Sequence, residues 1–291
     1  MRRLPATPSG SLHVRVNPWS KSALYAITWI ICLVFLFPFL SMFSTALKSD
    51  IEATSLPVHL IPVQWHWENF ANVMKNAPLF GRWILNSFIL SIFPTVGIVL
   101  ASSMAGFAFA RLRAPFKKQL FGIVLATLMI PTTSMFVPIY LFWRNVHAIG
   151  TYWPLILPSF FGDAFNVFLF RQFFASMPKE LEEAAIVEGC GRFRVWWSIF
   201  MPNALAVIAT SAIWHFNWRW NEFMMPRFLL NAMQSYPVPV GLLYAFKTEI
   251  GTSRVNMVSA GALIFAIPTI VVFMLGQKYL VQGFVTSGIK G

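Results

Sequence analysis

The stretch EAAIVEGCGRFRVWWSIFMP, residues 183–202, lies between two long apolar segments and decides how the rest of the chain is interpreted. Just before it, Pro178 suits the first turn of a helix. Glu180, Glu182 and Glu183 follow, and acidic side chains near the start of a helix complement its dipole. The stretch therefore predicts a short helix, followed by a turn and a return to the next apolar segment.

One face of the predicted helix is narrow. It is formed at helical spacing by Leu181, Ala184, Ala185 and Glu188. The two alanines would let this face approach another surface closely, and Gly189 and Gly191 would permit a sharp turn behind it. Periodicity leaves two interpretations open: a helix that docks against a partner, or an amphipathic helix that lies on the membrane surface.

The apolar segments are long enough to cross a bilayer. Of the 291 residues, 57% are hydrophobic and 11% are charged, which is too little charge for the surface of a soluble domain of this length. A span needs about 20 apolar residues to cross about 30 Å of hydrocarbon. Segments of this kind cover residues 23–43, 83–110, 120–143, 152–174, 204–223 and 257–280. The expected fold class is an all-α membrane protein with six transmembrane helices.

The basic residues indicate how the spans are oriented. The formal net charge is +12, but the basic side chains fall in short runs between apolar segments instead of clustering on one solvated face, as in a nucleic-acid binder. The runs lie in residues 1–21, 111–118 and 179–194. Positively charged loops remain cytoplasmic. We therefore expect a cytoplasmic tail over 1–21 and a six-span domain over 22–291, with both termini and the loop 178–202 in the cytoplasm.

Several other classes of site are not indicated by the sequence. Cys32 lies in an apolar segment and Cys190 in a polar loop, so no disulfide framework or metal site is expected. Arg2 and Arg3 are not followed by the short apolar stretch and cleavage site of a signal peptide, so the first span is expected to be retained. No phosphate-binding loop of the Gly-x-x-x-x-Gly-Lys-Ser/Thr type is present, so ATP would have to be used by another chain.

The stretch 183–202 resembles the EAA loop of ABC importer permeases, whose pattern is Glu-Ala-Ala, three residues, Gly, nine residues and Ile-x-Leu-Pro. The matching positions are Glu183, Ala184, Ala185, Gly189, Ile199 and Pro202. Met201 replaces the leucine, Glu188 stands where aspartate is usual, and Cys190 stands where alanine is usual. A further proline often found after Pro202 is missing.

The resemblance implies a type I ABC importer permease in a bacterial or archaeal cell membrane. In that family the loop forms a coupling helix that docks into a cleft of the ATPase subunit. The positions expected to serve this coupling are Glu183, Ala184, Ala185, Glu188, Gly189 and Pro202. The implied partners are a second permease, two ATP-binding subunits and an extracytoplasmic sugar-binding protein. We expect a transport subunit, not an enzyme, that binds no cofactor or metal itself, with ATP and Mg on the ATPase.

Further stretches resemble the smaller, maltose-type permease of carbohydrate importers. They are ENF at 68–70, FGRWILNS at 80–87, FRQFF at 170–174, WNEF at 220–223, YPVPVGL at 236–242 and SGIKG at 287–291. The resemblance implies a sugar as the cargo, with a glycerol phosphate or another polyol derivative as the alternative. An intramembrane enzyme is not expected, because it would need paired catalytic groups. An independent ion-coupled carrier is not expected either, because it would have no use for the EAA loop.

Polar residues within the spans are candidates for the translocation path. On the fifth span these are Trp214, His215 and Asn217, and on the second they are Asn86 and Ser87. Sugars bind to aromatic faces and amides, so these side chains would suit a sugar path. They would equally suit hydrogen bonds between helices.

One residue within a span and one outer loop are further candidates for function. Asp163 is a carboxylate within the fourth span, where it either serves transport or caps a helix that restarts after Gly162, and we favour the cap. By resemblance, part of the loop 224–256 meets the binding protein. That contact is expected within 234–241, at Gln234, Ser235, Tyr236 and Pro237.

Overall fold

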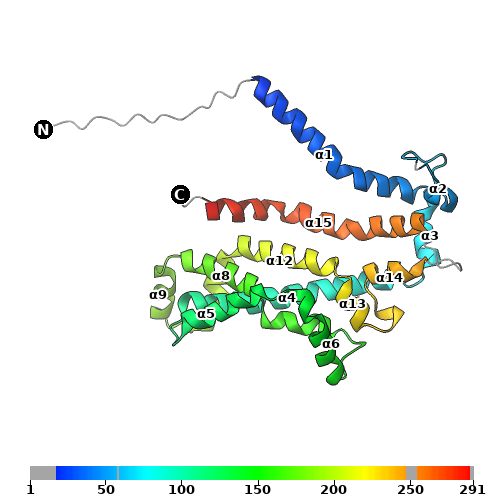
Figure 1. The fold of residues 1–291 in the computed structure, drawn as a ribbon. Helices are drawn as coiled ribbons and strands as arrows, with labels where there is room; N and C mark the ends of the chain where they lie inside the picture. The colour runs from blue at the N-terminus through cyan, green and yellow to red at the C-terminus, as the bar shows by residue number, and fades with distance from the viewer. Residues whose placement is uncertain (1–17, 58, 247–253, 289–291) are drawn as a thin grey trace.

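The structure is a computed structural model that describes residues 18–57, 59–246 and 254–288, so most of the predicted tail lies outside the described residues. Within these ranges all regular elements are helical. In chain order they are α1 (Pro18–Ala46), α2 (Asp50–Thr54), α3 (Glu68–Asn76), α4 (Phe80–Arg111), α5 (Lys117–Ala126), η1 (Thr127–Met129), η2 (Thr132–Met135), α6 (Phe136–Asn145), α7 (Trp153–Ile156), η3 (Leu157–Phe161), α8 (Ala164–Ser176), α9 (Glu180–Val187), α10 (Arg192–Val195), η4 (Trp196–Phe200), α11 (Met201–Asn203), α12 (Leu205–Trp220), α13 (Met224–Leu229), η5 (Met233–Ser235), α14 (Val238–Ala245) and α15 (Val255–Gly288). Figure 1 shows the long helices α4, α12 and α15 side by side.

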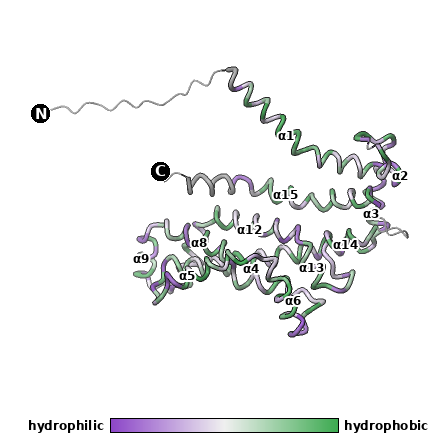
Figure 2. The backbone as a smooth tube through the Cα atoms, in the orientation of Figure 1, coloured by the Kyte–Doolittle hydropathy of each residue, from purple (hydrophilic) through white to green (hydrophobic). Residues whose placement is uncertain are grey.

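Four of the predicted spans are confirmed as long apolar helices. They are Lys21–Ala46, Phe80–Arg111, Trp153–Ser176 and Val255–Lys278. Figure 2 shows apolar residues along α1 and α15 and hydrophilic ones at α2, at α9 and at the tip of α6. This distribution fits a bundle whose middle lies in hydrocarbon and whose ends lie in water.

The chain is sharply bent within the predicted third span, 120–143, and at the start of the predicted fifth span, 204–223. Helices Lys117–Met129 and Thr132–Asn145 meet at 90°, with Pro131 at the break. Helices Arg192–Asn203 and Leu205–Trp220 meet at 82°. Proline ends a helix because it lacks the backbone N–H, and Pro202 precedes the second break by two residues. With each bent pair counted as one span, the described residues contain six candidate spans, the number that the sequence predicts.

Helix α4 is the centre of the bundle. Its most extensive contacts are with α8 and α12, whereas α1 reaches the bundle mainly through α15. None of the most apolar part of α1 is buried, and in Figure 1 this helix leans away from the others. At Gly106 of α4 an added Cβ would come within 2.7 Å of Phe170, so glycine lets α8 cross closely there.

Apolar cores form at both ends of α4. The α9-end core consists of Ile98, Val99, Phe107, Phe170, Phe174, Ala185, Val195, Trp196, Phe200, Ala204 and Val207. The α14-end core consists of Ala46, Val73, Ala77, Phe80, Trp83, Val238, Leu242, Phe246, Met257 and Ala260. Helices α9 and α14 lie at opposite ends of the molecule (Figure 1), as expected for loops in different compartments.

Candidate coupling and translocation sites

Helix α9 ends in the turn that the sequence predicts at Gly189. This residue has φ 83°, a left-handed conformation that favours glycine. Its N–H donates to the Ile186 carbonyl at 2.9 Å, and the N–H of Cys190 donates to the Ala185 carbonyl at 2.9 Å. This pair of bonds satisfies the last carbonyls of the helix in a Schellman motif. Gly191 has an ordinary φ of −69°, so its predicted role in the turn is not observed.

The predicted narrow face of α9 is divided between two surfaces. Ala185 is buried in the α9-end core, whereas Ala184 and Glu188 face outward. The expectation that Leu181, Ala184, Ala185 and Glu188 act as one face was therefore wrong, because Ala185 packs against its own bundle. The outward residues of α9 and its turn include Leu181, Glu183, Ala184, Ile186, Val187 and Glu188. Pro202 is exposed at the bend of the fifth span and stands apart from this set.

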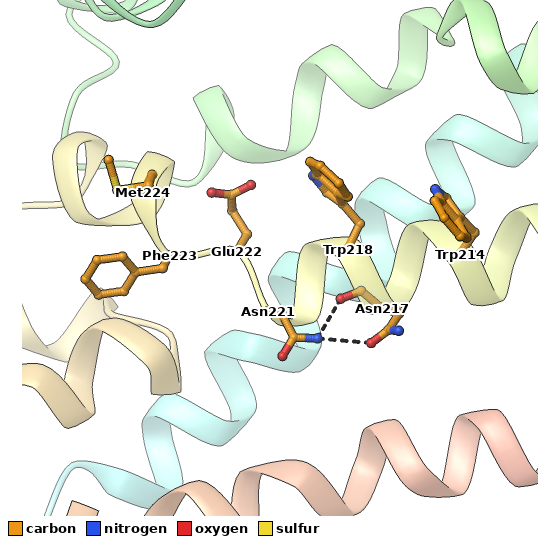
Figure 3. A pocket seen from close by; sticks show the side chains of 7 residues that line it. All are labelled: Trp214, Asn217, Trp218, Asn221, Glu222, Phe223 and Met224. Carbon is orange, nitrogen blue, oxygen red and sulfur yellow. Dashed lines mark hydrogen bonds between the residues drawn. The ribbon is translucent and has the colours of Figure 1, made fainter. Parts of the chain in front are cut away.

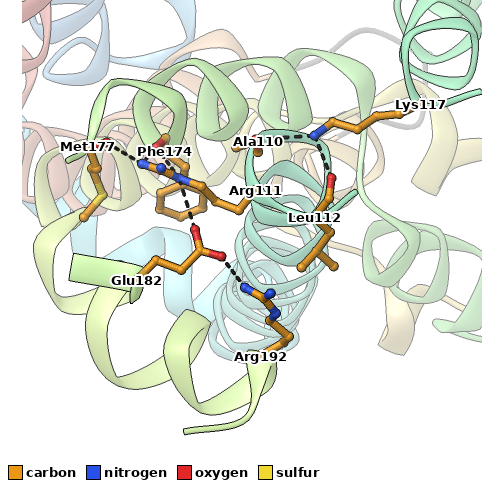
Figure 4. Close-up of polar contacts among 8 residues, drawn as sticks. All are labelled: Ala110, Arg111, Leu112, Lys117, Phe174, Met177, Glu182 and Arg192. Atoms are coloured by element: carbon orange, nitrogen blue, oxygen red, sulfur yellow. Dashed lines mark hydrogen bonds and ion pairs between the residues drawn. The ribbon is translucent and has the colours of Figure 1, made fainter. Parts of the chain in front are cut away.

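A partly buried ionic network, which the sequence pattern does not reveal, connects α9 to the bundle (Figure 4). The Arg111 side chain is 6% exposed and donates to the Phe174 carbonyl at 2.6 Å and the Met177 carbonyl at 2.5 Å. Its Nε lies 4.0 Å from Oε2 of Glu182. The other oxygen of Glu182 accepts a hydrogen bond from Arg192. From the sequence alone, Arg111 serves only to orient the spans, and Glu182 serves only as an acidic residue that complements the dipole of the predicted helix.

Two of the predicted path residues line a groove on α12 (Figure 3). The groove has a volume of about 520 Å³ and is lined by Trp214, Asn217, Trp218, Asn221, Glu222, Phe223 and Met224. Trp214 and Trp218 are 63% and 61% exposed and lie one turn apart. On the adjacent side, Nδ2 of Asn221 donates to Oδ1 of Asn217 at 3.0 Å. An aromatic row and an amide row thus run side by side.

His215, the third residue predicted for the path on the fifth span, does not line this groove. Its Nε2 is buried without a hydrogen-bond partner within the described chain. The charged side chains that act on it are Arg219, on the same helix, and Asp163, the cap of α8.

Asp163 is confirmed as a helix cap. It accepts a hydrogen bond from the Asn166 N–H at 2.9 Å, directly after Gly162 with φ 78°. The Asn166 side chain donates to the second oxygen of Asp163 at 2.6 Å and accepts from Ser211 Oγ at 2.5 Å. The carboxylate therefore restarts the fourth span as α8 and connects it to α12.

Asn86 and Ser87 hold a loop, which differs from the path-lining position predicted for them. They are 4% and 1% exposed. Asn86 Nδ2 donates to the carbonyls of Gln234 at 2.8 Å and Tyr236 at 2.9 Å, and Ser87 Oγ accepts from the Val238 N–H at 2.9 Å. Their polar atoms are therefore used within the chain.

The predicted binding-protein contact has one fully exposed member. Gln234 is exposed, Ser235 and Tyr236 are half-buried, and Pro237 is buried. Tyr152 Oη donates to the Ser235 carbonyl at 3.1 Å, which adds another anchor to this segment. Residues 247–253 of the same loop lie outside the described residues. In the described ranges no three His, Cys, Asp or Glu side chains gather as a metal site would require.

Several known permeases are similar to this chain over most of its length. The sn-glycerol-3-phosphate transport system permease protein UgpE of Yersinia pestis is 31% identical over 260 residues, which cover 88% of this chain and 92% of that protein. The probable ABC transporter permease protein YurM of Bacillus subtilis is 30% identical, covering 99% and 97%. The arabinooligosaccharides transport system permease protein AraQ of Bacillus subtilis is 27% identical, covering 93% and 96%.

The fold and a family model lead to the same assignment. The crystal structure of a bacterial ABC transporter involved in the import of the acidic polysaccharide alginate contains a chain that matches with a TM-score of 0.79 at 23% identity, covering 94% of this chain and 100% of that chain. The family model of the binding-protein-dependent transport system inner membrane component matches residues 97–285, which include the whole loop 178–202. The chain therefore belongs to this family of inner membrane components and is a permease subunit of an ABC importer.

Proposed function

We propose that this permease carries a neutral sugar or oligosaccharide and receives the motion of an ATPase through α9. An ABC importer permease works with a partner permease, an ATPase and a binding protein. In the proposed complex these are a second permease, two ATP-binding subunits that hold ATP and Mg, and an extracytoplasmic sugar-binding protein. This chain itself would hold no cofactor, and its termini and α9 would face the cytoplasm.

The groove on α12 carries the proposal of a neutral cargo. The exposed faces of Trp214 and Trp218 offer stacking surfaces, and Asn217 and Asn221 offer amide donors and acceptors beside them. The one ionisable side chain among its lining residues is Glu222, which is acidic.

A phosphate ester would need basic donors at such a site. Arg219 lies nearby in sequence, but its Nη2 is directed to Ser159 Oγ at 3.1 Å and it does not line the groove. The lining therefore favours a neutral polyhydroxylated cargo over sn-glycerol 3-phosphate, although a relative is named for that phosphate ester.

Binding to the assembled importer in nanodiscs tests the cargo. Arabinotriose and maltotriose are the neutral probes, and sn-glycerol 3-phosphate is the anionic probe. We expect saturable binding of a neutral probe that weakens about tenfold in Trp218→Ala, because one stacking face is lost. Trp153→Ala is the matched control, since Trp153 is also 63% exposed but lies outside the groove. Saturable binding of the phosphate ester alone would overturn the proposal.

The outward surface of α9 carries the proposal of docking. Val187 is 89% exposed, and Leu181 and Ile186 are 41% and 40% exposed, beside the carboxylate of Glu183. Exposed apolar side chains on a short polar-ended helix favour burial against a partner protein. The Schellman turn at Gly189 would keep this surface in a fixed orientation.

Copurification with the ATPase tests docking. Glu183→Lys reverses the charge of the outward surface, and Gly189→Pro is incompatible with φ 83°. We expect both variants to reach the membrane with the partner permease and to lose most of the bound ATPase. Normal ATPase binding and transport in both would contradict docking through α9.

A further inference from the structure

The attachment of α9 to its own bundle depends on two buried side chains, Glu182 and Ala185. Ala185 contributes a small apolar contact within the α9-end core. Glu182 contributes a carboxylate, 12% exposed, that reaches Arg111. Force applied to the outward surface of α9 must therefore pass into the spans through these contacts and through the chain on either side of the helix.

The Arg111 guanidinium joins four elements at one point. It lies at the last residue of α4 and bonds to the Phe174 carbonyl near the end of α8 and to the Met177 carbonyl just beyond it. It faces Glu182 of α9, and it lies over the ring of Phe200 in η4, with 5.1 Å between its carbon and the ring centroid. A cation at the end of α8 also complements the negative end of that helix dipole.

Beneath the guanidinium the same elements are packed by aromatic rings. The ring centroids of Phe107 and Phe200 are 4.9 Å apart, and those of Phe174 and Phe200 are 5.4 Å apart. Phe107 precedes Arg111 by one helical turn, so both side chains lie on one face of α4. The end of α4 is thus a rigid platform, because edge-to-face rings fix its position relative to α8 and η4.

We propose that Arg111 is a positioning residue that, through Glu182, makes α9 move as one body with the ends of α4 and α8. The inference rests on the proposed docking of α9 but concerns a different surface, which faces away from the ATPase. Arg192, whose side chain is 55% exposed, is the second partner of Glu182 and holds its carboxylate from the side of α10. Without the carboxylate, α9 would remain helical and docked, but its displacement would be absorbed by the connecting segments.

The test compares Glu182→Gln with Glu180→Gln in the full importer complex reconstituted in liposomes. Both substitutions remove one negative charge from the first turn of α9, but Glu180 is exposed and lies outside the Arg111 network. We expect Glu182→Gln to keep ATPase binding and ATP hydrolysis while solute transported per ATP falls about tenfold. Glu180→Gln should match the unmodified complex.

A distance measurement provides a readout that a purely structural role would not change. Spin labels at Lys179→Cys and Ala114→Cys, with Cys32 and Cys190 replaced by serine, report the separation of α9 from the end of α4. We expect one narrow distribution with and without trapped ATP in the parent, and a broadened one in ATP-trapped Glu182→Gln. An unchanged distribution with unchanged transport per ATP would overturn the inference.

Arg111 itself is tested with a pair of substitutions. Arg111→Gln removes the charge, whereas Arg111→Lys keeps the charge but not the planar fork that bonds two carbonyls while it faces the Glu182 carboxylate. We expect Arg111→Lys to recover part of the transport per ATP that Arg111→Gln loses.

Loss of ATPase binding in Glu182→Gln would instead mean that Glu182 belongs to the docking surface. Failure of docking as such would show as normal ATPase binding in Glu183→Lys, so the two proposals fail in distinguishable ways.

Discussion

Helix α4 holds a distant segment of the chain at each of its ends, by different chemistry. At one end a buried guanidinium and a carboxylate hold α9, with 4.0 Å between Arg111 Nε and Glu182 Oε2. At the other end three neutral side chains hold residues 233–238. Asn86 and Ser87 bond to this segment at 2.8 to 2.9 Å, and Trp83 Nε1 donates to the Met233 carbonyl at 2.7 Å.

The two ends of α4 differ in whether the segment that is held must carry a particular side chain. The neutral side chains all bond to backbone atoms, so they fix the path of the segment whatever side chains it carries. Gln234 is left exposed and free to contact another protein. The ionic connection depends on one particular side chain of α9, the Glu182 carboxylate, which faces the Arg111 guanidinium. The neutral arrangement therefore fixes a backbone path, whereas the ionic arrangement makes the attachment of α9 to the bundle depend on a single carboxylate.

The largest effect is expected where the neutral connection is converted into a charged one. Asn86→Asp keeps the shape of the side chain but turns two donors into acceptors, which then face the carbonyls of Gln234 and Tyr236. Because the site is 4% exposed, we expect at least about 3 kcal/mol of lost stability. Thermal unfolding in detergent measures the lost stability, and the rate of protease cleavage within 233–238 measures the release of the segment.

The control for this prediction lies on the same loop. Asn231→Asp introduces the same charge at an exposed position, so it should leave both measurements nearly unchanged. Equal effects of the two substitutions would show that charge on the loop matters, and not the bonds from α4.

A smaller effect is expected from crowding the contact between Trp83 of α4 and Gly241 of α14. A Cβ on Gly241 would lie 2.4 Å from the ring of Trp83, which is 2% exposed and cannot rotate away without losing its bond to Met233. We expect Gly241→Ala to cost about 1–3 kcal/mol in thermal unfolding. Gly81→Ala has open space around the new methyl group and should be neutral or slightly stabilising. If both alanines behave alike, the segment is less tightly held than the bonds indicate.

The sequence predicted the α9 end of the molecule better than the groove or the outer loop. A short helix, its acidic start and the turn at Gly189 follow from local rules, because capping involves neighbours in sequence. Asp163 was predicted as a cap for the same reason. The spans follow from length and composition, but the bends of 90° and 82° do not, because a proline in or beside an apolar run permits both a mild kink and a full break.

Sequence patterns do not predict contacts between segments that are distant in the chain. Asn86 and Gln234 are 148 residues apart, and Arg111 and Met177 are 66 apart. A polar side chain in a span is compatible with a path or with a bond to another helix, and the choice depends on packing that a pattern does not contain. The sequence therefore predicts Asn86, Ser87, Trp214, His215 and Asn217 alike for the path, whereas the structure separates Trp214 and Asn217, which line a groove, from the other three.

The smallest predicted effect sharpens the comparison at the α9 end, where two nearby glycines differ only in backbone conformation. Neither Gly189 nor Gly191 has an atom within 4 Å of an added Cβ, but their φ angles are 83° and −69°. Gly189→Ala should therefore cost about 1–2 kcal/mol of local stability, because a side chain disfavours the left-handed conformation. Gly191→Ala should cost nothing and gain a few tenths of a kcal/mol from a less flexible unfolded chain. Hydrogen exchange at the Gly189 and Cys190 positions, whose N–H groups close the Schellman turn, should accelerate about tenfold in the first variant and stay unchanged in the second. If Gly189→Ala exchanges like Gly191→Ala, the turn contributes little, and the ionic connection through Glu182 must by itself set the orientation of α9.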